Sequence, residues 1–110
     1  MEDEKIPYQY ILVRKDLPVE VQMINIAHAA GESILVAPIP STTRVFLLGV
    51  DNEAQLMEYV RLVQAKEYHF VLIREPDEPY NNAAMSIGLA PSDKRNQMKK
   101  LFYHLEKLKV

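Results

Sequence analysis

The sequence predicts an α/β domain built on one mixed four-stranded sheet with helices on both faces. Apolar, β-branched segments alternate along the chain with segments whose apolar residues recur at helical spacing. This alternation is typical of parallel strands joined by helical crossovers. The last two strand-like segments have no helix between them, so one of them is expected to run antiparallel to its neighbours. The 110 residues are enough for one domain, and the expected order is β-α-β-α-β-β-α.

A strand and then a helix are expected near the start of the chain. Aromatic and β-branched residues over 8–14 indicate the strand. Asp16 and Pro18 end it, and either residue can begin the helix. The helix is expected to end at Gly31 or to continue to about residue 35. Its apolar residues recur at helical spacing and are Val19, Met23, Ile26, Ala27 and Ala30.

Three more strands and a second helix are expected in the middle of the chain. A loop over 37–41 leads into the nearly continuous apolar segment 43–50, which suits a strand covered on both faces. Asp51 is a good N-cap for the second helix. Strands are expected again over 68–74 and 84–90. The apolar stripe of the second helix consists of Leu56, Met57, Val60 and Val63.

The C-terminal region is expected to form a helix that opens at Pro91 and Ser92, with Ser92 as its N-cap. Residues 93–110 carry six Lys or Arg and two acids, a net charge of +4, whereas the whole chain carries −2. This asymmetry either steers a polyanion to one end of the molecule or reflects only a solvated helix face. The apolar stripe of this helix consists of Met98, Leu101, Phe102, Leu105 and Leu108.

Composition limits the setting in which the protein is expected to work. The chain has no cysteine, so it has neither a disulfide framework nor a thiolate metal site, as expected in a reducing cytoplasm. No apolar segment approaches the roughly 20 residues that span a bilayer. The acidic first residues lack the apolar centre of a signal peptide. We therefore expect a cytoplasmic protein with no membrane contact, no cofactor and no metal, in which residues 1–7 are a flexible tail and 8–110 a single domain.

Polar residues on the first helix form one stripe opposite the apolar stripe. Gln22, Asn25, His28 and Glu32 follow one another at spacings of three, three and four. The alanines beside His28 allow another backbone or a ligand to approach closely. His28 is therefore a candidate general base, hydrogen-bond donor or nucleic-acid contact. The alternative is a histidine that only packs against the sheet and bonds a strand end.

The loop over 75–82 is unusually polar, with three carboxylates and two carboxamides between two strands. Loops at the end of an α/β sheet commonly carry the chemistry, so Glu75 or Asp77 is a candidate to orient His28 or to activate water. The alternative is a self-bonded loop in which Asp77 accepts backbone N–H groups and an asparagine takes a left-handed conformation. Candidate donors to a carbonyl or phosphate oxygen are Asn81, Asn82 and Ser86.

Three features, which together cover nearly the whole chain in order and spacing, carry a family resemblance. They are Arg14-Lys15-Asp16-Leu17 after the first strand, Gln22 and Asn25 ahead of His28-Ala29-Ala30, and the segments Ile73-Arg74-Glu75 and Ile87-Gly88-Leu89-Ala90-Pro91 around the polar loop. Together they resemble the second, archaeal–eukaryotic class of peptidyl-tRNA hydrolases, and the chain looks like a divergent member of that superfamily. In that family a compact α/β domain cleaves the ester between a peptide and the 3′ end of tRNA.

The resemblance implies attack of water on an acyl ester. It matches His28 to the family's helix histidine, Glu75 to a position that is usually Asp, and Ser86 loosely to a threonine. The chain also departs from the family pattern. A glycine- and lysine-rich turn is replaced by Pro18-Val19-Glu20-Val21, and a glutamine ahead of the histidine becomes Asn25. Losing a lysine next to a phosphate removes a charge-assisted contact of about 1.5–3 kcal/mol.

Two functions remain open from the sequence. The first is hydrolysis of peptidyl-tRNA or a related acyl ester, with His28, Glu75 and Asp77 as the catalytic residues and tRNA or peptidyl-tRNA as the partner. The second is a non-catalytic module that binds a small ligand or a protein on the same fold. An open edge strand is also expected to allow pairing into a homodimer. The residues expected to bind substrate are Gln22, Asn25, Asn82, Ser86, Lys94, Arg95, Lys99 and Lys100.

Overall fold

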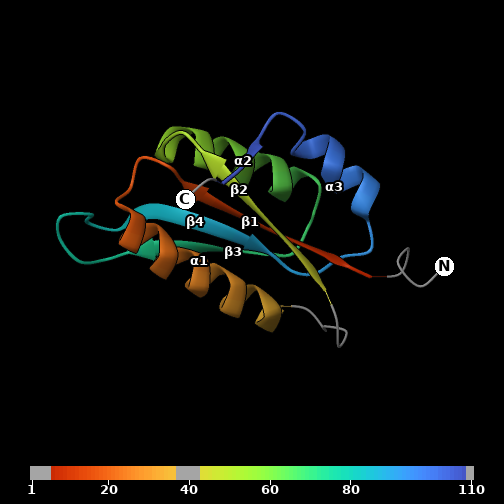
Figure 1. Cartoon of the computed structure of the whole chain (residues 1–110), viewed down its shortest axis with the longest axis horizontal. Coiled ribbons are helices and arrows are strands. Elements are labelled where there is room, and N and C mark those ends of the chain that lie inside the picture. Colours follow the sequence, from red (N-terminus) through yellow and green to blue (C-terminus); the bar gives the residue numbers. More distant parts are fainter. Residues whose placement is uncertain (1–5, 37–42, 109–110) are drawn as a thin grey trace.

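The computed structural model of the protein describes residues 6–36 and 43–108 (Figure 1). Most of the predicted N-terminal tail and the whole predicted loop over 37–41 lie outside these residues. Within the described ranges, none of the helices is both long and apolar enough to cross a membrane.

The elements follow the predicted order up to the third helix, after which the chain adds a strand that the sequence did not predict. In order they are β1 (Tyr8–Arg14), α1 (Val19–Ser33), the 3-10 turn η2 (Ile34–Val36), β2 (Arg44–Val50), α2 (Glu53–Ala65), β3 (Phe70–Glu75), β4 (Ala83–Leu89), α3 (Arg95–Leu101) and β5 (Glu106–Lys107).

These strands form one mixed sheet, which confirms the α/β class, but the described sheet has five strands and not the predicted four. The strand order is β3-β4-β1-β2-β5. Strand β1 runs parallel to β2 and antiparallel to β4, while β3 pairs antiparallel with β4. Helix α1 covers one face of the sheet, and α2 and α3 cover the other (Figure 1).

The fifth strand replaces the second half of the predicted C-terminal helix. Helix α3 ends at Leu101, and Phe102 turns inward with its ring centroid 4.8 Å from that of Tyr10. The chain then pairs with β2, and the N–H of Leu108 donates to the carbonyl of Leu47 at 3.0 Å. Pairing satisfies backbone groups at an edge of β2 that a longer helix would leave without partners. The predicted order therefore lacks its last element.

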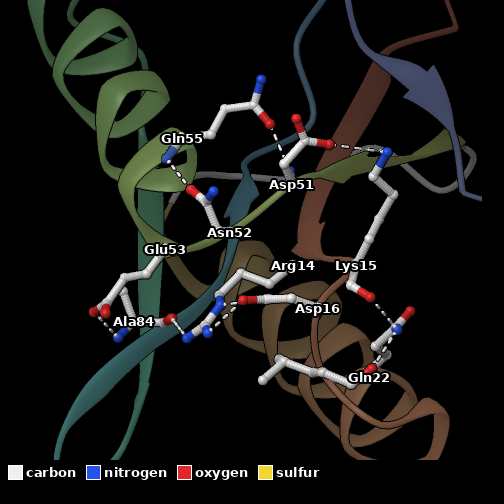
Figure 2. Close-up of polar contacts among 10 residues, drawn as sticks. Arg14, Lys15, Asp16, Gln22, Asp51, Asn52, Glu53, Gln55 and Ala84 are labelled. Atoms are coloured by element: carbon white, nitrogen blue, oxygen red, sulfur yellow. Dashed lines mark hydrogen bonds and ion pairs between the residues drawn. The ribbon is translucent and has the colours of Figure 1, made fainter.

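Both predicted N-caps of the later helices are displaced along the chain. Asn52, and not Asp51, caps α2, and its side chain accepts from the N–H of Gln55 at 2.9 Å (Figure 2). Helix α3 begins three residues after Ser92, whose hydroxyl instead accepts from the N–H of Lys94. The bond of Asn52 is the capping bond of α2, whereas the bond of Ser92 closes a turn that precedes α3.

The face under α2 and α3 contains the main hydrophobic core. The rings of Tyr8, Tyr10 and Phe46 contact one another, with centroids 4.5–6.3 Å apart. Leu56 and Val63 of α2 pack against this face and are fully buried. The predicted apolar stripe of α2 therefore faces the sheet, as its helical spacing indicates.

Helix α1 packs only in part as predicted: Ile26 and Ala30 of the predicted apolar stripe pack against the sheet, but other members of the two stripes are exchanged. Val19 and Met23 of the predicted apolar stripe are 54% and 61% exposed, whereas Gln22 and Asn25 of the predicted polar stripe are buried. The reason lies in β4, where a Cβ atom on Gly88 would stand 2.4 Å from the carbonyl oxygen of Ala29. The helix backbone lies so close to the strand that only small or flat polar side chains fit between them.

Candidate functional site

The C-terminal ends of β1 and β2 carry a dense group of polar contacts (Figure 2). Arg14 makes two bonds of 2.9 Å to the carboxylate of Asp16 and a third, of 3.0 Å, to the carbonyl of Ala84. Glu53 accepts from the N–H of Ala84 at 2.8 Å. The bond to Asp16 raises the pKa of Arg14. Such edges of α/β sheets commonly bind ligands, but here the side chains bind one another and join β1, β4 and α2.

Two of the predicted catalytic residues, His28 and Glu75, lie near each other on the face of the sheet that α1 covers. His28 from α1 and Glu75 from the end of β3 line one open cleft of about 390 Å³. The side chain of His28 is 56% exposed, so it is open to solvent and not sealed in the interior. Its Nδ1 lies 3.5 Å from Oε2 of Glu32, one helical turn further on, and Arg74 lines the same cleft.

A second hollow of about 250 Å³ adjoins the cleft, because Asn25 and Glu75 line both. Asp77, the third predicted catalytic residue, lines this second hollow and not the cleft of His28. Glu75 accepts a hydrogen bond from the N–H of Asp77 at 3.1 Å. The three predicted catalytic residues therefore border two adjoining hollows, with His28 beside one, Asp77 beside the other and Glu75 beside both.

The rest of the polar loop is partly self-bonded, as the alternative interpretation expected. Asn81 and Asn82 both take the left-handed conformation, with φ angles of 49° and 69°. The backbone carbonyl of Asp77 accepts from the N–H groups of Tyr80 and Asn81. The backbone carbonyl of Asn82 accepts from the guanidinium of Arg74 at 2.9 Å. Asn82 thus contributes its backbone to the loop and lines neither hollow.

Two other predicted substrate-binding residues are used in packing. Gln22 is buried and donates to the carbonyls of Lys15 and Leu17, which fixes the turn before α1. Ser86 is fully buried, and its hydroxyl donates to the carbonyl of Asn25 at 2.9 Å, which holds α1 against β4.

The predicted phosphate-binding residues and His28 lie on opposite faces of the sheet. The basic residues belong to α3 and to its N-cap, on the face of the sheet opposite α1, and Figure 1 shows α3 and the β3–β4 loop at opposite ends of the molecule. The charged groups of Arg95 and Lys99 lie 5.0 and 5.6 Å from the centre of the Tyr8 ring. Lys94 and Lys100 line separate shallow hollows on this side.

Sequence reasoning named Glu32 in the polar stripe but gave no role to it or to Arg74. The i,i+4 spacing of His28 and Glu32 was a usable signal, because residues at that spacing are neighbours on a helix. Nothing local indicates Arg74, whose place in the cleft depends on how β3 is paired. Among the described residues, no group of three His, Cys, Asp or Glu side chains is arranged to hold a metal ion.

Comparisons of this chain with models of protein families and with curated proteins gave no match. The family resemblance of the sequence therefore stays a prediction, and function is considered below from the geometry of the site.

Proposed function

We propose that this protein hydrolyses an acyl ester of the kind that joins a peptide to tRNA, in the cleft between α1 and the end of β3. The observation that supports this most directly is that His28 and Glu75, from elements far apart in the sequence, line one solvent-open cleft. A histidine, two carboxylates and a guanidinium in one cleft are sufficient for the steps of ester hydrolysis.

In the proposed reaction, His28 is the general base. The carboxylate of Glu32, 3.5 Å from Nδ1, favours a proton on that nitrogen, which leaves the lone pair of Nε2 to take a proton from water. The water oxygen bonds to the ester carbon, and the carbonyl oxygen becomes an oxyanion. Collapse breaks the bond to the leaving oxygen, which receives the proton from His28, and the products are a carboxylic acid and an alcohol.

Two other residues of the cleft have roles in this proposal. Glu75 orients the attacking water, since it lines the cleft from β3 whereas His28 lines it from α1. Arg74 has five N–H donors, and one of its terminal nitrogens already bonds the carbonyl of Asn82. Its remaining donors are available to the oxyanion, as positioned cations commonly are in acyl transfer.

A non-catalytic binding module on the same fold is the second candidate. It is favoured by the position of the basic residues, because the cations of α3 and the cleft of His28 are on different faces of the sheet. An RNA held by α3 would have to wrap around an end of the domain for its 3′ end to reach His28. A smaller ester or a simple ligand needs no such path.

The test is turnover of an aminoacyl-tRNA and of its N-acetylated form, each followed as loss of the ester. His28→Ala should lower kcat/KM by about 10²–10⁴-fold, the usual effect of removing a general base, and Glu75→Gln should lower it as well. His69→Ala is a matched control, since His69 is an exposed histidine outside the cleft. The proposal fails if the folded wild-type protein shows no turnover above a heat-killed control, or if His28→Ala and His69→Ala behave alike.

Binding of tRNA at increasing salt separates the large substrate from a small one. If several phosphates are contacted, log affinity should fall steeply and linearly with log salt. Turnover of a small ester together with a flat salt response would remove tRNA as the partner and keep the chemistry.

A further inference from the structure

The hollow beside the cleft combines apolar walls with an acidic rim. Its volume is about 250 Å³, below the roughly 300–1,000 Å³ of pockets for drug-sized ligands. None of the described residues that line it is Lys, Arg or His. The walls are Val21, Ile24 and Tyr80, and the rim carries Glu75, Asp77 and Glu78.

A buried side chain with an unpartnered acceptor lines both this hollow and the cleft. Asn25 is only 3% exposed, and its Nδ2 donates to the carbonyl of Val21 at 2.9 Å, which fixes the orientation of the amide because a carbonyl can only accept. Within the described part of the chain, no hydrogen bond reaches Oδ1 of Asn25, although every side-chain oxygen or nitrogen shut off from solvent there has a partner. Oδ1 must therefore reach solvent, and the solvent next to Asn25 is that of the hollows it lines.

An acceptor at the floor, carboxylates at the rim and apolar walls together favour one kind of occupant. The occupant should present N–H donors to Asn25. It should carry positive charge, because the rim has three carboxylates. It should also have a small apolar part for Ile24 and Tyr80 to contact. A protonated α-amino group next to an apolar side chain has all three properties.

We propose that the second hollow binds the free α-amino group and side chain of an acyl residue, so that the preferred substrates are aminoacyl esters. This inference rests on the proposed function. Because Asn25 and Glu75 border both hollows, an amino group held by Asn25 leaves the neighbouring ester carbonyl beside His28. An N-blocked residue lacks the charge, and its blocking group must fit within the same small volume.

The first experiment measures binding without turnover. Leucinamide, which carries a protonated amine, and N-acetyl-leucinamide, which does not, are titrated against the protein at pH 6.5 and followed by amide chemical shifts. A charge-assisted hydrogen bond contributes about 1.5–3 kcal/mol, so leucinamide should bind about tenfold tighter or more. The largest shifts should occur around Ile24, Asn25 and Tyr80.

Variants of the exposed loop then test the charge. Asp77→Asn combined with Glu78→Gln should abolish most of the preference, whereas Glu58→Gln, an exposed acid on α2, should leave it unchanged. Equal binding of the two amides, or a preference that survives the double substitution, would overturn the inference.

Turnover distinguishes this inference from the proposed function. Leucine methyl ester should have a higher kcat/KM than its N-acetyl form, again by about tenfold or more. Selective binding of leucinamide without any ester hydrolysis would support the ligand class and reject the esterase. Hydrolysis of both esters at equal rates would keep the esterase and reject the preference for a free amino group.

Discussion

The two faces of the sheet are held by different kinds of contact. On one face, Leu56 and Val63 of α2 are fully buried in a cluster of aliphatic and aromatic side chains. On the other, the buried residues of α1 are polar or small, and hydrogen bonds join the helix to the sheet. Gln9 of β1 donates to the hydroxyl of Ser33 at 2.8 Å, and Ser86 of β4 donates to the carbonyl of Asn25.

This difference shows that burial and hydrophobicity can separate within one small domain. Helix α2 buries apolar side chains, and its attachment to the sheet is stabilised by the apolar area removed from solvent. Helix α1 approaches the sheet closely at Ala29, and its Met23 and Ile24 are more than half exposed. Its attachment relies on the close backbone approach and on directional bonds, each of which contributes about 0.5–1.5 kcal/mol net.

Shortening one apolar side chain on each helix should give the largest contrast. Leu56→Ala should lower the free energy of unfolding by about 2–5 kcal/mol, because it removes fully buried groups and leaves a cavity. Met23→Ala on α1 should change it by no more than about 0.5 kcal/mol, since the side chain is largely exposed. Urea unfolding measures both. Similar losses in the two variants would mean that the outer face of α1 is covered in solution.

Adding a methyl group tests the close approach of α1. Gly88→Ala should cost about 1–3 kcal/mol or more, because the new Cβ would meet the backbone of Ala29 at 2.4 Å, where nothing flexible can give way. Gly31→Ala, on α1 itself, is the control. Its Cβ meets nothing within 4 Å, and it should stabilise the protein by about 0.5–1 kcal/mol through helix propensity. Thermal unfolding of the pair should shift in opposite directions, and a neutral Gly88→Ala would contradict the packing described for α1.

Removing one directional bond should have a smaller effect. Ser86→Ala deletes the hydrogen bond to the carbonyl of Asn25 and should lower the free energy of unfolding by about 1 kcal/mol. Hydrogen exchange should show the loss first in the amides of α1, because α2 does not depend on this bond. Uniform loss of protection in both helices would argue against independent attachment of the two faces.

The smallest expected effect is a change in how stability depends on alkaline pH, caused by Tyr10 in the main hydrophobic core. Burial, and secondarily the neighbouring Tyr8, raise the pKa of Tyr10 above its usual value of 10.0. The stability that depends on neutral Tyr10 is therefore complete below pH 10 and is lost as pH rises through the raised pKa. Tyr10→Phe should reduce the loss of stability between pH 9 and pH 11. An unchanged pH profile would show that the Tyr10 hydroxyl does not titrate with unfolding.

Much of the architecture could be predicted from the sequence, because long periodic segments determine it. The α/β class, the three helices and most strand positions follow from apolar spacing. The orientation of α1 could not be predicted this way, because it depends on Gly88 lying under Ala29, a contact between residues far apart in sequence. Strand β5 has only two residues, Glu106 and Lys107, and contains no apolar pattern of its own. It forms because the edge of β2 supplies hydrogen-bond partners.

The sequence predicts several residues of the candidate site but not how they are arranged. The sequence pointed to His28 and Glu75, and the pairing of β3 brings them to one cleft. The sequence does not distinguish polar residues that face solvent from those that hold α1 against the sheet. It therefore predicts Gln22 and Ser86 as substrate-binding residues, although both are buried. Residue type alone cannot make this distinction, because glutamine and serine suit a binding site and a buried hydrogen bond equally well.

The hydrogen bonds on α1 also restrict how that helix can move. Contacts near its start, middle and end, made by Gln22, Asn25 and Ser33, would all have to break for it to roll about its axis or slide by one turn. An interface held only by non-directional apolar contacts would resist such rotation or sliding of the helix less. The helix therefore holds the backbone of His28 beside the cleft before any ligand binds, and the entropy of ordering that wall is lost during folding.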